Sequence, residues 1–251
     1  MAPDPLQALQ AANRRPSDGR PSKGALLIAG ATGVLGHELV RRLAGRHRFD
    51  HTYVLAREPI RDGLPGVETV QVPDLPMAQW PPVAARTALV LFEPPRLFYD
   101  RERALWTPEP AQLPALAGWL RSCGVQTLAV VLPHDQGRLP EALKRGLASL
   151  DEQAVVALGF ERVLLVRSAQ KPVARRLAHP AERLAAWMLS IARFMVPPSE
   201  QPARASKVAE LVDVALALAP PGVHVAAPEL VWRATQGELR SVVQGWVAAG
   251  P

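Results

Sequence analysis

The feature that most constrains this chain is a glycine-rich turn that directly follows a short apolar run. The run is Ala25–Ala29, and the turn is Gly30–Gly36, with glycines at its first, fourth and seventh positions. An uninterrupted apolar run of this length is typical of a strand buried on both faces of a parallel sheet. After the turn, Leu35, Leu39 and Leu43 recur every four residues, a spacing that predicts an amphipathic helix. The sequence therefore predicts a strand, a tight turn and a helix that packs against the strand.

Strand and helix patterns alternate along the rest of the chain. Further strands are expected at Thr52–Ala56, Val67–Val72, Ala88–Phe92, Gln126–Leu132, Arg162–Val166 and, as a short one, Val223–Ala226. Helices are expected at Pro114–Ser122, Glu141–Leu158, Ala181–Val196 and Ala205–Ala219. This alternation predicts an α/β fold with a doubly wound parallel sheet. We expect a single domain over 23–251, whose C-terminal part from about 168 onwards forms a small helical cap, and a disordered polar extension at 1–22.

Composition excludes several classes of protein. Of 251 residues, 48% are hydrophobic and 21% are charged, which is ordinary for a globular protein and excludes a disordered chain. No uninterrupted apolar run reaches the roughly 18 residues of a membrane-spanning helix. The net charge of +6 is dispersed, which favours a solvated arginine-rich surface over a nucleic-acid-binding face. The single cysteine, Cys123, excludes an internal disulfide and favours a reducing compartment, so we expect a cytoplasmic protein.

The glycine positions have a physical reason if the turn binds a dinucleotide. Gly30 lets the chain turn sharply out of the strand, Gly33 lets backbone amides approach a pyrophosphate, and Gly36 lets the helix pack closely on the sheet. The positive end of the helix then faces the phosphates. The expected cofactor-binding residues of the turn are Gly30, Ala31, Thr32, Gly33, Val34, Leu35 and Gly36. The alternative is a glycine turn retained in a domain whose pocket has closed.

Here the sequence resembles the short-chain dehydrogenase/reductase superfamily, in particular its atypical, NmrA-like branch of NAD(P)-binding Rossmann-fold proteins. That branch carries Gly-Ala-Thr-Gly-x-x-Gly after its first strand, as this chain does at Gly30–Gly36. Less specific likenesses occur at Leu55-Ala56-Arg57, at Asp74, at 157–167 and at 207–212. The resemblance covers roughly Gly24 to Leu230 and implies a bound nicotinamide dinucleotide, with Asp74 near the adenine.

The end of the second strand bears on which nucleotide is preferred. Arg57 stands there, and an arginine suits the 2′-phosphate of NADP, whereas NAD sites usually place a carboxylate at this point. Glu58 follows at once, and Asp50 precedes the strand, so NAD remains the alternative. Phe92 and Leu132, at the ends of the fourth and fifth strands, complete the expected cofactor-binding set.

The catalytic pattern that the resemblance implies is absent. Catalytic members of the superfamily carry Tyr-x-x-x-Lys and a Ser or Thr after the fifth strand. This chain has only Tyr53 and Tyr99, and neither has a lysine four residues on. His134, at the end of the fifth strand, and Lys144 are the only candidates for a replacement. The sequence Phe92-Glu93-Pro94-Pro95 also departs from the small residues usual beside the cofactor, and we expect it to crowd the nicotinamide half or to repel its charge.

Three functional hypotheses follow. The first is a catalytically degenerate, NADP-preferring protein that uses the nucleotide as a redox signal or a structural ligand. The second is an active NAD(P)-dependent oxidoreductase or isomerase with an unusual proton donor, so whether the chain is an enzyme stays open. The third is a protein-interaction module with an empty nucleotide pocket. No metal site is expected, because the single cysteine excludes a Cys-x-x-Cys pair, the usual basis of a structural zinc site.

Overall fold

The computed structural model describes residues 24–45, 48–60, 66–96, 99–134, 149–169 and 203–248, without the side chains of the two strand-end residues His134 and Ala169. Its strands are β1 (Ala25–Ala29), β2 (His51–Ala56), β3 (Val67–Gln71), β4 (Thr87–Leu91), β5 (Thr127–His134), β6 (Arg162–Ala169) and β7 (Gly222–Ala226). Its α-helices are α2 (Gly33–Gly45), α3 (Asp100–Arg103), α4 (Leu113–Ser122), α6 (Leu150–Ala157), α8 (Ala205–Leu218), α9 (Pro228–Gln236) and α10 (Leu239–Ala248). Two short 3-10 helices lie at Met77–Gln79 and Pro110–Gln112.

The strands form one sheet in the order β3-β2-β1-β4-β5-β6-β7, and every neighbouring pair is parallel. The chain therefore starts in the middle, winds outwards to β3 and then returns to wind the other way from β4. This order, with the reversal between β1 and β4, is that of a doubly wound Rossmann sheet. The predicted fold class is confirmed.

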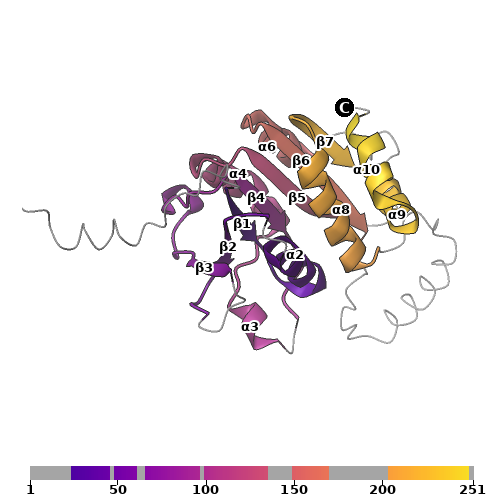
Figure 1. Ribbon diagram of the computed structural model, residues 1–251. Coiled ribbons are helices and arrows are strands. Elements are labelled where there is room, and N and C mark those ends of the chain that lie inside the picture. Colours follow the sequence, from indigo (N-terminus) through magenta and orange to yellow (C-terminus); the bar gives the residue numbers. More distant parts are fainter. Residues whose placement is uncertain are drawn as a thin grey trace, which may run out of the picture.

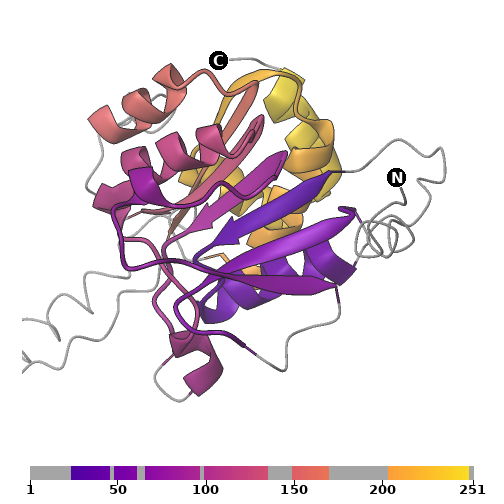
Figure 2. The same ribbon diagram turned by 90° about the vertical axis from the view of Figure 1, so that its left-hand side faces the viewer.

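Helices cover both faces of the sheet (Figures 1 and 2). The helices α2, α8, α9 and α10 pack on one face, and α4 and α6 pack on the other. The alternation of side chains along β1 explains why the run is apolar throughout: Leu26 and Ile28 contact the first helical layer, while Leu27 and Ala29 contact the second. The short helix α3 lies outside both layers, beyond an edge of the sheet (Figures 1 and 2).

The predicted strands all occur within a few residues of their expected bounds, and the expected helix at Pro114–Ser122 is α4. The predicted short strand at Val223–Ala226 is β7, which extends the sheet beyond β6. The sequence patterns missed α3, α9 and α10. The expected extension at 1–22, the expected helix at 181–196 and the first part of the one expected from Glu141 lie outside the described residues, so the extension and the extent of the C-terminal cap stay predictions.

Candidate functional site

The glycine turn lies between β1 and α2, at the carboxyl ends of the parallel strands. Gly30 and Gly33 have φ angles of 79° and 72°, a backbone conformation that side chains disfavour. A Cβ at Gly30 would lie 2.0 Å from the carbonyl oxygen of Leu91 in β4, so only glycine fits there. A Cβ on Gly36 would lie 2.5 Å from the backbone carbonyl carbon of Ala31, which holds the first turn of α2 directly against the loop.

Two carboxylates of the chain itself contact the backbone amides at the start of α2. The amide of Gly33 donates to Oε2 of Glu102 (3.1 Å), and the amide of Leu35 donates to Oε2 of Glu93 (2.8 Å). The buried Thr32 hydroxyl donates to the carbonyl oxygen of Glu93 and lies 2.9 Å from Oγ1 of Thr107. The unpaired amides and the dipole of a helix attract anions at this end, and here glutamate side chains supply the negative charge.

Glu102 is the more constrained of the two glutamates. It is 7% exposed, and Arg96 donates to it three times: from Nε (2.7 Å) and from Nη2 to Oε1, and from its backbone amide to Oε2 (2.8 Å). Burial raises the pKa of Glu102, but hydrogen bonds from the Arg96 side chain and from the Arg96 and Gly33 amides outweigh burial and leave the pKa below its ordinary value. The guanidinium of Arg96 also lies 3.7 Å from the centre of the Tyr99 ring. Glu102 is therefore ionised at neutral pH.

The backbone beyond α3 crosses the carboxyl ends of β1 and β2. The amide of Gly30 donates to the carbonyl oxygen of Trp106 (3.1 Å), and the amide of Trp106 donates to that of Leu55 (3.0 Å). The amide of Arg57 donates to the carbonyl oxygen of Ala104 (2.7 Å). In a doubly wound fold, the adenosine half of a dinucleotide lies at this edge. We call residues 93–96 and 99–107 of the β4–α4 connection the cover, because they contact both the turn and the end of β2.

The other predicted cofactor residues lie along the same edge of the sheet. Arg57 is exposed and directly follows β2, and Asp74 is exposed in a bend after β3. Phe92 is buried directly after β4, and Leu132 is half-buried near the end of β5. The fold thus brings the ends of β1, β2, β4 and β5 to one edge, as the sequence predicts, while the assignment of these residues to a cofactor stays a prediction.

The structure describes the candidate catalytic residues only in part. His134 is the last residue of β5, so its backbone lies at that same edge, but its side chain is outside the described residues. Lys144 lies wholly outside them. Tyr53 is in β2, and Tyr99 is beside α3, where its ring contacts Arg96. No group of three His, Cys, Asp or Glu side chains in the described residues is arranged to hold a metal ion.

The backbone of the turn fits a pyrophosphate, because its amides already hold anions. The space in front of it is filled, however. A Cβ on Gly33 would lie 2.2 Å from Cδ of Glu93, so the Glu93 side chain occupies the position that Gly33 would leave for a phosphate. A dinucleotide therefore fits this turn only when the carboxylates of Glu93 and Glu102 have moved away.

The sequence singled out Glu93, but it did not indicate which group the Glu93 carboxylate contacts. Glu93 was expected to disfavour the nicotinamide half, whereas its carboxylate contacts the amide of Leu35. Glu102, Arg96 and Trp106 were not singled out. The signal for Glu102 was weak, because it is 69 residues from Gly33 and lies in a four-residue helix that has no apolar periodicity.

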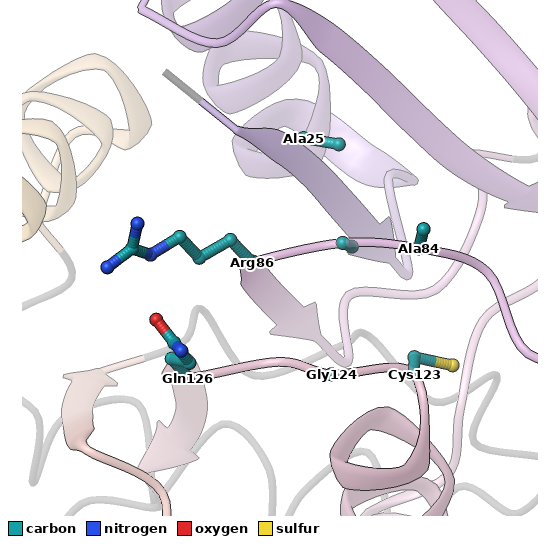
Figure 3. Close-up of a pocket in the computed structure, with 7 residues that line it drawn as sticks. Ala25, Ala84, Arg86, Cys123, Gly124 and Gln126 are labelled. Atoms are coloured by element: carbon teal, nitrogen blue, oxygen red, sulfur yellow. The ribbon is translucent and has the colours of Figure 1, made fainter. Parts of the chain in front are cut away.

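A hollow lies at the amino ends of the strands, away from the glycine turn. It has a volume of about 400 Å³ and is lined by Ala25 at the start of β1 and by residues just before β4 and β5, among them Arg86, Gln126 and Cys123 (Figure 3). The Cys123 thiol is buried and accepts a hydrogen bond from the Val83 amide (3.3 Å); burial raises the pKa of this thiol. This hollow has no contact with the glycine turn. No helix among the described residues is long and apolar enough to cross a membrane.

Of the known proteins compared with this chain, only solved structures are similar to it. No family model and no curated protein sequence matches this chain. The enzyme WbmH of Bordetella bronchiseptica in complex with NAD+ is 11% identical, with a TM-score of 0.43 over 84% of this chain and 80% of that chain. WbmG of the same organism in complex with NAD is 13% identical, with a TM-score of 0.44 over 88% and 81%. MoeE5 in complex with UDP-glucuronic acid and NAD is 17% identical, with a TM-score of 0.46 over 80% and 75%.

Identities and TM-scores this low carry no argument about what this chain binds or does. The assignment of the fold rests instead on the order of the strands, their parallel pairing and the glycine turn between β1 and α2. On those grounds the chain is a Rossmann-fold protein, which is the fold that the resemblance in the sequence implies.

Proposed function

We propose that this chain is a catalytically degenerate Rossmann-fold protein of the NmrA-like kind, which binds NADP at its glycine turn and transfers no hydride. The observation that carries the proposal is the pair of carboxylates on the amides of Gly33 and Leu35. These contacts identify the turn as an anion site in a backbone conformation that suits a pyrophosphate. The absence of a Tyr-x-x-x-Lys pair supports a role other than reduction.

The preference for NADP over NAD rests on Arg57. This residue follows β2 directly and its side chain is exposed, so its guanidinium is available to pair with the 2′-phosphate. Glu58 is exposed beside it and is the residue that would favour NAD.

Calorimetric titration with NADPH and with NADH tests this function. We expect NADPH to bind more tightly, and Arg57→Ala to remove most of the difference between the two nucleotides. Arg240→Ala is the matched control, because Arg240 is an exposed arginine on α10, away from the turn. Equal affinity for NADPH and NADH in the wild-type protein would refute the NADP preference. Oxidation of NADPH with a carbonyl substrate would refute the catalytic degeneracy.

The carboxylates also support a second candidate, a protein-interaction module that holds no nucleotide. Glu93 and Glu102 satisfy the amides of the turn without any ligand, so the fold does not need a dinucleotide for its stability. This candidate predicts that neither nucleotide binds to the wild-type protein or to a variant in which Glu93 has been replaced by alanine.

A further inference from the structure

We propose that the cover is an intramolecular competitor for the anion site of the glycine turn, so that nucleotide binding and docking of the cover exclude each other. This inference deepens the proposed function by naming the regulation of the same site. It rests on the fact that the cover and a nucleotide would use the same backbone amides. The amides of Gly33 and Leu35 cannot hold the carboxylates of Glu102 and Glu93 and a pyrophosphate at the same time.

The competition has a steric and an electrostatic component. The Glu93 side chain fills the space in front of Gly33, where Cδ lies 2.2 Å from the position of an added Cβ. A pyrophosphate brought to this place would meet two carboxylates at short range, and like charges repel most strongly where water is excluded. Both glutamates must therefore leave before the phosphates can approach.

The backbone of the cover blocks a second part of the cleft. Trp106 is 9% exposed; it holds the amide of Gly30 through its carbonyl oxygen and donates its own amide to Leu55 at the end of β2. Leu105 forms an antiparallel bridge with Ala56. An adenosine at the end of β2 would thus meet the cover as well as the carboxylates, and opening has to extend from Glu93 to this bridge.

The two glutamates differ in how firmly they are held, and this decides which one to change. Glu102 is buried and paired with Arg96, so its replacement also disturbs the packing of α3. Glu93 is half-buried, and its carboxylate contacts the Leu35 amide. Substitution of Glu93 is therefore the milder way to clear the turn.

The apparent affinity for a ligand equals the affinity of the open form multiplied by the fraction of molecules that are open. Removal of one charge-assisted hydrogen bond to the turn raises the open fraction, and we expect Glu93→Ala to bind inorganic pyrophosphate and NADPH about 10- to 100-fold more tightly than the wild-type protein. Glu161→Ala is the matched control. It removes the same charge, but Glu161 is exposed and lies just before β6, outside the cover. We expect Glu161→Ala to change neither affinity by more than about 2-fold.

Titration of the full chain with both ligands separates the two proposals. Tighter binding of pyrophosphate and of NADPH to Glu93→Ala supports both. If Glu93→Ala binds pyrophosphate more tightly but neither protein binds NADPH, the competition by the cover is supported and the proposed function is refuted. If each ligand binds equally well to the wild type and to Glu93→Ala, the cover does not compete for the turn, and the proposed function still stands. If neither protein binds either ligand, both proposals are wrong.

Hydrogen exchange provides a readout that does not depend on affinity. If the cover leaves the turn when NADPH binds, amides of residues 99–107 exchange faster in the saturated wild-type protein, because the hydrogen bond from the Trp106 amide to the carbonyl oxygen of Leu55 is broken. Unchanged or slower exchange over these residues at saturation would refute the displacement.

Discussion

Gly36 provides a sharp test of how closely α2 must approach the turn. In Gly36→Ala, the new Cβ lies 2.5 Å from the carbonyl carbon and 2.9 Å from the oxygen of Ala31. Ordinary van der Waals contact begins near 3.4 Å, so the helix has to move by most of an ångström. The clashing atoms belong to the backbone and cannot rotate aside. Overpacking of this kind costs about 1–3 kcal/mol, against a gain of about 1 kcal/mol from replacing a helical glycine by alanine.

We therefore expect Gly36→Ala to lower the free energy of unfolding by up to about 2 kcal/mol. Gly118→Ala is the matched control: this glycine lies within α4 and has no atom within 4 Å of an added Cβ, so the change should stabilise by up to about 1 kcal/mol. Urea unfolding of both variants measures the difference, provided that the denaturant slopes agree. A Gly36→Ala protein as stable as Gly118→Ala would refute the close packing of α2 on the turn.

Three further predictions concern groups outside this contact. Glu102→Gln destabilises the protein at pH 7, and the difference shrinks as the pH falls from about 5 towards 2, because a carboxyl with a lowered pKa loses its stabilising contribution on protonation; urea unfolding at several pH values would contradict this if the difference stayed constant. Asp213→Asn, which weakens the ion pairs of the buried Asp213 carboxylate to the half-buried Arg42 and Arg48 and so loosens α2 from α8, should cost about 2–3 kcal/mol in the same assay, and a loss under about 0.5 kcal/mol would refute that role. Burial and the raised pKa of Cys123 should make its thiol react with a disulfide reagent at least about 10-fold more slowly in the folded protein than in urea, and equal rates would show that it is accessible.

The sequence was informative where local patterns dictate local structure. The apolar run of β1, the glycine spacing and the four-residue leucine period of α2 each follow from interactions between neighbours in the chain, and the structure has all three. A sharp turn out of the strand was expected at Gly30, and its φ angle of 79° provides that turn. The helices α9 and α10 were missed although they are amphipathic; only two residues separate them, so the apolar period of one is soon interrupted by that of the next.

The occupant of the turn could not be predicted in the same way. The contacts that fill it join Gly33 to Glu102 across 69 residues and Leu35 to Glu93 across 58. No periodicity or spacing in the sequence predicts the pairing of these carboxylates with the amides of the turn. The pairing depends on how the β4–α4 connection returns across the ends of β1 and β2. A glycine motif read alone predicts only the donors of an anion site, and the acceptor that completes it comes from another part of the chain.

The carboxylates also explain how a domain can keep an anion-binding turn without a permanently bound ligand. The first amides of α2 would otherwise lie at a closed edge of the sheet without hydrogen-bond acceptors, and buried unpaired amides cost about 1–3 kcal/mol each. Glu93 and Glu102 remove that cost in the absence of nucleotide. The same contacts have to be broken when a nucleotide binds, so they subtract from its affinity. If the proposed function is right, half-occupancy of this turn needs more nucleotide than half-occupancy of an uncovered turn would, which suits a protein that responds to the nucleotide better than one that keeps it as a tightly held catalytic cofactor.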